Sequence, residues 1–240
     1  MHKVNKAKVF VAGILLIGVL VSGYLLVDHY IAKNSDDVKI INKIKSNQHK
    51  KTPVVTKDDL LTLVNFENEL PEDWKVDLVK LNNGQAVDRR ILNDLQEMLE
   101  KMRSSGLKPL ICSSYRTNEK QEKLFHDKVK EYINQGYKTD EAMDKAAFWV
   151  ARPGTSEHQL GLAIDIVATN NQRLDKSQEK TAEQQWLMEN SWKYGFILRY
   201  PTDKSMITGV GYEPWHYRYV GKVHAQKIKE QGICLEEYVK

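Results

Sequence analysis

Cysteine and excess charge are both scarce in this chain. Only Cys112 and Cys234 occur among its 240 residues, which excludes a disulfide-dense scaffold and a cysteine-rich zinc finger. The formal net charge is +4, and three of the lysines precede residue 9. The remainder is therefore close to neutral and lacks the basic surface that nucleic-acid binding requires. An apolar fraction of 41% and a charged fraction of 28% indicate a folded protein.

One long apolar run lies near the start of the chain. Residues 9–27 contain no charged side chain, and a helix of that length matches the thickness of a bilayer. Lys3, Lys6 and Lys8 precede the run, so the positive-inside rule puts residues 1–8 in the cytoplasm and the rest outside. A cleaved signal peptide is the alternative, but no small-residue cleavage site follows. The sequence predicts a single-pass cell-membrane protein with its remaining residues extracytoplasmic.

The rest of the chain divides into a polar linker, residues 28–59, and a folded domain, residues 60–240. Hydrophobic periodicity in that domain predicts helices at 88–103, 117–135, 139–150 and 181–194, and strands at 109–112, 162–167, 196–198 and 215–220. Thr117 and Thr139 are the expected N-caps of two of these helices. The mixed order predicts an α+β fold in which helices flank a small antiparallel sheet.

A carboxylate and an imidazole stand close together in and before the strand at 162–167. Side chains alternate along a strand, so Asp165 lies on the face opposite Ile164, beside the small Ala163. A carboxylate in that position needs a partner. His158 lies in the preceding loop, where the chain can fold back toward Asp165. Helix capping or pairing with an arginine is the alternative role of this carboxylate.

A second imidazole, His216, lies in an aromatic strand, with Glu213 three residues before it. Pro214 cannot donate to a strand ladder, so the strand begins after it and Glu213 can turn toward His216. Two imidazoles and a carboxylate are typical zinc ligands, and a further glutamate is a suitable general base. Taken alone, such a histidine is more often an ordinary core residue. The remaining histidines are not expected to bind metal: His2, His29, His49, His126 and His224.

The third segment contains Arg116, which follows the end of a predicted buried strand and directly precedes the N-terminus of a predicted helix. A guanidinium there can bind a carboxylate or a developing oxyanion, and a surface salt bridge is the alternative. Whether Cys112 and Cys234 form a disulfide stays open, because the sequence does not give their separation.

These motifs together resemble a known family. S-x-H-x-x-G-x-A-x-D at 156–165, preceded by S-x-Y-R at 113–116 and followed by E-x-W-H at 213–216, is similar to the zinc D-Ala-D-Ala carboxypeptidases of bacterial cell walls, in particular the VanY type. The resemblance covers about residues 60–240 and implies a zinc site at the sheet face. It assigns one zinc ion to His158, Asp165 and His216. It assigns the general base to Glu213.

The resemblance also implies the substrate and its contacts. It assigns Arg116 both catalytic and substrate-binding roles, and it places Gln121, Ser156 and Tyr200 in the substrate pocket. Trp215 is expected either to form a wall of that pocket or to belong to the core. The implied activity is removal of the terminal D-alanine from peptidoglycan stem pentapeptides, with a contribution to glycopeptide resistance. Two alternatives stay open: an L,D-carboxypeptidase acting on tetrapeptides, and a non-catalytic zinc-stabilised module that binds the cell wall.

Overall fold

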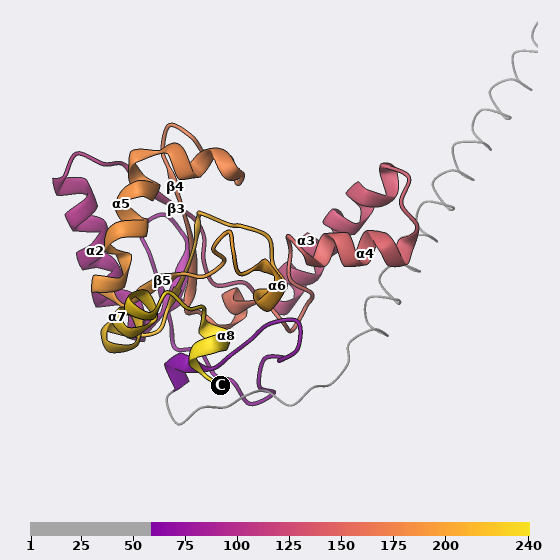
Figure 1. Cartoon of the computed structure of the whole chain (residues 1–240), viewed down its shortest axis with the longest axis horizontal. Helices are drawn as coiled ribbons and strands as arrows, with labels where there is room; N and C mark the ends of the chain where they lie inside the picture. The colour runs from indigo at the N-terminus through magenta and orange to yellow at the C-terminus, as the bar shows by residue number, and fades with distance from the viewer. Residues whose placement is uncertain (1–58) are drawn as a thin grey trace, which may run out of the picture. The chain divides into compact units, whose positions relative to one another are not determined.

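The computed structural model describes residues 59–240 (Figure 1). The predicted cytoplasmic segment, the predicted anchor at 9–27 and the predicted linker as far as residue 58 lie outside the described residues. Between residues 59 and 240, no helix has both the length and the apolar character needed to cross a bilayer.

An antiparallel sheet of four strands lies at the centre of the fold, in the order β3-β4-β6-β5. A separate pair, β1 and β2, forms a short hairpin. The strands are β1 (Leu78–Lys80), β2 (Ala86–Asp88), β3 (Pro109–Ser113), β4 (Ala163–Ala168), β5 (Phe196–Leu198) and β6 (His216–Tyr219). The predicted small antiparallel sheet within an α+β fold is confirmed.

Helices cover the sheet unevenly: α2, α5 and α7 gather on one side of it, whereas α3 and α4 project on the other (Figure 1). The α-helices are α2 (Leu92–Ser104), α3 (Asn118–Asn134), α4 (Thr139–Ala147), α5 (Ala182–Asn190), α6 (Ser205–Thr208), α7 (Lys222–Gln231) and α8 (Leu235–Tyr238). Short 3-10 helices are η1 (Asp59–Leu61), η2 (Arg89–Ile91), η3 (Glu157–Leu160), η4 (Lys176–Lys180) and η5 (Ser191–Tyr194).

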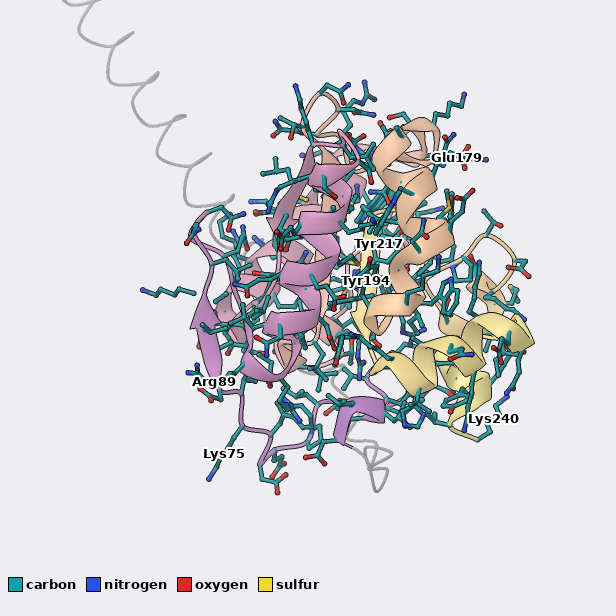
Figure 2. The ribbon with its side chains drawn as sticks, turned by 90° about the vertical axis from the view of Figure 1, so that its left-hand side faces the viewer. Lys75, Arg89, Glu179, Tyr194, Tyr217 and Lys240 are labelled. Atoms are coloured by element: carbon teal, nitrogen blue, oxygen red, sulfur yellow. The ribbon has the colours of Figure 1, made fainter. Side chains whose placement is uncertain are left out.

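The main core lies between the sheet and α2 and α5. Ile164 of β4 and Tyr217 of β6 are fully buried in one cluster with Leu95 of α2. Figure 2 looks onto this helical layer and shows α2 and α5 side by side, with Tyr217 between them. Because side chains alternate along a strand, the neighbours Asp165 and His216 point to the opposite face. The apolar packing of one face thereby fixes which residues the other face presents.

The helix boundaries follow the predicted signals in part. Thr117 caps α3, since its hydroxyl accepts the Lys120 N–H. The prediction that Thr139 is the N-cap of α4 is wrong. The extended residue before it, Lys138, holds that position, and Thr139 is already helical. The predicted helix at 181–194 divides into α5 and η5, which ends at Gly195 with φ +83°.

The two cysteines are not joined by a disulfide in the described part of the chain. Cys112 and Cys234 are both free. The Cys112 thiol lies 3.5 Å from the backbone oxygen of Asp165, and burial raises its pKa to about 12. Cys234 precedes α8 at its N-cap position. The disulfide that the sequence left open is therefore not formed.

Gly161 joins η3, which carries His158, to β4, which carries Asp165. Its φ is +77°, and a Cβ there would lie 2.7 Å from Val76 Cγ1. Gly161→Ala should lower the free energy of unfolding by about 2–4 kcal/mol, because left-handed strain and overpacking both contribute. Urea denaturation measures this loss.

Gly106→Ala is the matched control for that substitution. Gly106 has φ +83°, and a Cβ there would meet nothing within 4 Å. Its replacement should cost only the left-handed strain, about 1–2 kcal/mol. Equal losses in the two variants would contradict a packing constraint at Gly161.

Candidate metal centre and active site

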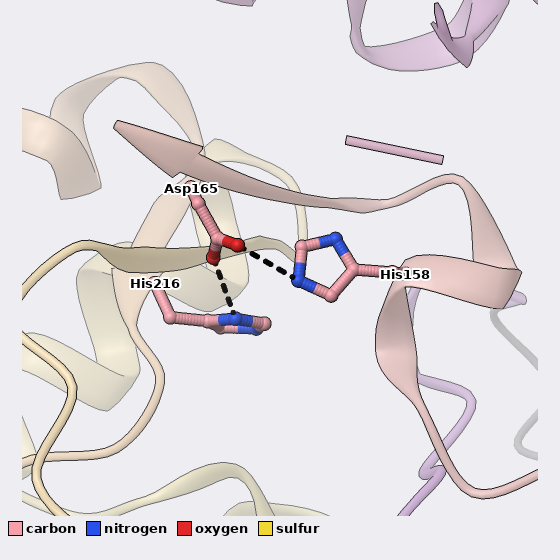
Figure 3. A group of neighbouring side chains, drawn as sticks. All are labelled: His158, Asp165 and His216. Atoms are coloured by element: carbon pink, nitrogen blue, oxygen red, sulfur yellow. Dashed lines mark ion pairs between the residues drawn. The ribbon is translucent and has the colours of Figure 1, made fainter. Parts of the chain in front are cut away.

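Strand register brings a carboxylate and an imidazole together. Asp165 of β4 lies directly opposite His216 of β6, and residues paired in this way project on the same face with neighbouring side chains. His158 reaches them from η3, the short helix that precedes β4. Figure 3 shows the Asp165 carboxylate between the two rings. Its Oδ2 is 3.3 Å from His158 Nε2, and its Oδ1 is 3.1 Å from His216 Nδ1.

Each imidazole presents one nitrogen to this triad and the other to a protein oxygen. His158 Nδ1 lies 2.8 Å from the backbone oxygen of Ser114. A carbonyl can only accept, so Nδ1 carries the proton and Nε2 directs its lone pair toward Asp165. His216 is turned the other way, with Nδ1 toward Asp165 and Nε2 toward Glu157 Oε2 at 3.6 Å. Metal-binding histidines are held in this manner.

The triad fits a zinc ion. One donor atom from each of His158, Asp165 and His216 lies within 4.8 Å of the others. Asp165 Oδ1 is buried yet accepts no hydrogen bond from any residue that the structure describes, and an unsatisfied carboxylate oxygen is costly unless a cation approaches it. Three protein ligands that leave a fourth position open are the usual arrangement of a catalytic zinc site.

Burial and neighbouring charges set the protonation of these groups. Burial, together with the Arg116 guanidinium, lowers the pKa of His158 to about 4, which keeps this imidazole neutral and able to bind metal. Burial alone would raise the pKa of Asp165, but the two histidines hold it well below its ordinary value. Burial would lower the pKa of His216, but the nearby carboxylates of Asp165 and Glu157 raise it to about 9.

Glu213 lies beside the triad without belonging to it. Its backbone N–H donates to Tyr200, and its backbone oxygen accepts the His216 N–H, so the chain turns just before β6. This turn places Glu213 Oε2 3.8 Å from His216 Nδ1. Burial raises the pKa of Glu213 to about 8 against the opposing effect of His216. A carboxyl group with such a pKa can both take up and release a proton near neutral pH.

Arg116 contacts the triad itself. Its Nη2 donates to Asp165 Oδ2 at 2.9 Å, and its Nε and Nη2 both donate to Ser113 Oγ. Gln121 is fully buried, accepts from Arg116 Nη1 at 3.4 Å and donates to the backbone oxygen of Ala151 at 2.7 Å. Gln121 therefore orients Arg116 and does not line the adjacent cavity.

A cavity of about 290 Å³ opens beside the triad. Its lining includes Arg116, Ser156, Tyr200, Glu213 and Trp215, each of which the sequence assigned to the site. Further lining comes from side chains that the sequence analysis did not single out: Leu124, Lys128, Trp149, Leu174 and Val210. The cavity is thus charged near the triad and largely apolar along these further residues. A charged end beside an apolar wall suits a peptide terminus with its apolar side chains.

A larger groove of about 830 Å³ lies elsewhere, between the β1–β2 hairpin, α2 and β3. None of the triad residues lines it. We therefore place the candidate site in the smaller cavity, where titratable groups converge.

Sequence reasoning also missed an acidic group of the site, Glu157. It stands between Ser156 and His158 in the motif. The hydrophobic pattern around it does not indicate that the side chain is buried. Its Oε1 accepts from Arg199 Nε at 2.7 Å and from Arg218 Nη1 at 2.8 Å.

Comparison with known proteins gives a consistent result. A family model described as VanY: D-alanyl-D-alanine carboxypeptidase matches residues 84–222, more than half of the chain. A D-alanyl-D-alanine carboxypeptidase of Enterococcus faecalis is 49% identical over 179 residues. That alignment covers 75% of this chain but 65% of the relative, so the chain spans less than two thirds of that protein's length.

Solved structures extend the likeness to the fold. A mutant of the vancomycin resistance D,D-pentapeptidase VanY, in complex with Zn(II), aligns with a TM-score of 0.69 at 48% identity and covers 75% of this chain and 98% of its own. The LD-carboxypeptidase LdcB aligns with a TM-score of 0.65 at 32% identity and covers 78% and 92%.

Proposed function

Because this chain belongs to the VanY family of D-alanyl-D-alanine carboxypeptidases, we propose that it is a zinc-dependent D,D-carboxypeptidase that removes the terminal D-alanine from peptidoglycan stem pentapeptides. One observation carries the proposal. Glu213, a buried carboxylate with a raised pKa, lies against a metal-binding triad at the charged end of a peptide-sized cavity. The zinc bound to the VanY structure supports the choice of metal.

The proposed ligands are His158, Asp165 and His216, and Glu213 is the proposed general base. When bound, zinc supplies Lewis acidity and lowers the pKa of water to about 7. Glu213 takes a proton from the attacking water and returns it to the amine nitrogen of the departing D-alanine. Its raised pKa suits both transfers, since the group must be basic in the first step and acidic in the second.

A carboxypeptidase must also recognise a free carboxylate, and Arg116 is the proposed partner. Its guanidinium lines the cavity next to the triad, and Ser113 and Gln121 hold it there. A planar guanidinium binds carboxylates strongly and in a defined geometry. The Ser156 hydroxyl lies in the same cavity and supplies a second donor, while Tyr200 and Trp215 form its walls.

The proposed location is the outer face of the cytoplasmic membrane. The charge-free run at 9–27 and the lysines before it support an anchor of that orientation. Peptidoglycan stems lie on that side. Removal of terminal D-alanine destroys the dipeptide that glycopeptide antibiotics bind, so a contribution to resistance is part of the proposal.

Two other functions remain to be separated from this one. An L,D-carboxypeptidase would use the same site on a tetrapeptide, and the likeness to LdcB gives this alternative a basis. The higher identity to the VanY structure favours D,D activity. A binding module without turnover is disfavoured by Glu213, because a purely structural zinc site has no need of a buried base beside it.

Stem-peptide hydrolysis tests the proposal. The purified full-length chain should release one D-alanine from a pentapeptide stem, leave the tetrapeptide intact and lose activity when a chelator removes the metal. Mass spectrometry of the products distinguishes these outcomes. Cleavage of the tetrapeptide alone would overturn the D,D assignment. Tight binding of either peptide without cleavage would instead indicate a binding module.

A further inference from the structure

A buried ionic cluster lies on the Nε2 side of the His216 ring, opposite the nitrogen that faces Asp165. Two arginines and two glutamates form it, and none of their side chains is more than 7% exposed. Its members come from four separate segments: Glu157 of η3, Arg199 after β5, Arg218 of β6 and Glu236 of α8. Charges buried to this degree are costly unless each is paired and hydrogen-bonded.

Every charged side chain of the cluster has an oppositely charged partner, but one carboxylate oxygen of Glu157 faces the metal site instead of an arginine. Glu157 Oε1 accepts from both Arg199 Nε and Arg218 Nη1. Glu157 Oε2 points instead toward His216 Nε2, 3.6 Å away. Both of these facing atoms are buried and lack a hydrogen-bond partner within residues 59–240.

We infer that Glu157 is a positioning residue, which receives the Nε2–H of His216 and thereby fixes Nδ1 of that ring toward the metal. The inference rests on the metal site of the proposed function and deepens it. His158 is supported on the same side by a shorter contact, because its Nδ1 lies 2.8 Å from the Ser114 carbonyl oxygen. Each proposed imidazole ligand is thus oriented through its far nitrogen, an arrangement that strengthens metal binding.

The arginines prevent the Glu157 carboxylate from turning away. Arg199 Nη1 and Nη2 donate to the two carboxylate oxygens of Glu236, at 2.9 and 2.6 Å. Arg218 Nη2 donates to the backbone oxygens of Leu60 and Thr62. With both guanidiniums anchored elsewhere, Glu157 Oε1 has a fixed position, and Oε2 must face His216.

The burial of these charges would also be explained if the cluster only stabilised the fold. A matched pair of variants separates that role from the positioning of His216. Glu157 and Glu236 are both buried carboxylates on Arg199, but only Glu157 faces His216. The amide of Glu157→Gln can offer its oxygen to the arginines or to His216, not to both. Glu236→Gln also disturbs Arg199, which donates two hydrogen bonds to Glu236, and leaves the Glu157 carboxylate unchanged.

Metal binding by the full-length chain tests this inference without any hydrolysis assay. After chelation, zinc affinity is measured by competition with a chromophoric chelator, and the ligand geometry is followed by the visible absorption of the cobalt-substituted protein. Glu157→Gln should weaken zinc binding about 10–100-fold and shift the cobalt spectrum. Glu236→Gln should lower the melting temperature by a similar amount and leave both metal readouts at the parent values.

A second variant guards against misfolding. Glu157→Asp keeps a negative charge for the arginines but withdraws the carboxylate from His216, so it should fold and still bind zinc more weakly than the parent. Equal zinc affinities in the Glu157 and Glu236 variants would overturn the positioning role. A parent that binds zinc but releases no D-alanine would refute the proposed function and leave this inference standing.

Discussion

Replacing Glu213 by glutamine should lower kcat for D-alanine release by about 10²–10⁴-fold, the usual contribution of a general acid–base group. Glutamine preserves the volume of the side chain but cannot take up a proton. The triad of His158, Asp165 and His216 supplies three donors without Glu213, so zinc content should stay at the parent level. Steady-state kinetics on a pentapeptide stem, combined with metal analysis of the same sample, checks both parts.

Glu122→Gln provides the control, since Glu122 is half-buried on α3, where it accepts a hydrogen bond from Asn118. Its replacement should change neither rate nor metal content. Parent-like activity of Glu213→Gln would show that the base is assigned to the wrong residue. Loss of zinc together with activity would show that Glu213 is a metal ligand instead. The two failures are therefore distinguishable in one experiment.

The sequence was informative wherever short-range periodicity decides the outcome. The pattern around Asp165 could be predicted because β4 alternates between the helix-covered core and the site face, and Ile164 and Ile166 are indeed buried in that core. Glycine at 195 and the threonine cap at 117 likewise act through local backbone geometry. These features need no knowledge of distant contacts.

Contacts between distant segments could not be predicted in the same way. The resemblance assigned Gln121 to the substrate pocket, and nothing in the sequence indicated its hydrogen bonds to Arg116 and Ala151. A glutamine on a helix has the same local signal in either role, and only tertiary packing decides which atoms it meets. The added wall of the cavity, with Trp149 and Val210, was missed for the same reason.

The burial of Glu157 illustrates the limit most clearly. Acidic residues are seldom fully buried, so the residue type gives no indication that Glu157 is buried. Its burial becomes favourable only because Arg199, just after β5, and Arg218 of β6 pair with it. These arginines lie 42 and 61 positions away from Glu157, so no short stretch of sequence reveals this pairing, even though Glu157 is next to the proposed ligand His158.

His158→Ala and His216→Ala should each weaken zinc binding by more than about 100-fold, beyond the range seen when only a supporting group is lost. Each removes one of three donors, and the remaining imidazole and Asp165 cannot complete a tetrahedral site. D-alanine release should fall with the bound metal. Metal analysis after dialysis and competition with a chromophoric chelator measure the loss.

His224→Ala is the matched control, because this histidine lies on α7, where its Nδ1 pairs with the Tyr238 hydroxyl at 2.7 Å. Its removal should leave zinc affinity unchanged. Parent-like zinc binding in either His158→Ala or His216→Ala would contradict the triad, since Asp165 and a single imidazole would then suffice. If both variants lose zinc while His224→Ala retains it, both imidazoles are metal ligands, one delivered by η3 and the other by the strand pairing that sets His216 opposite Asp165.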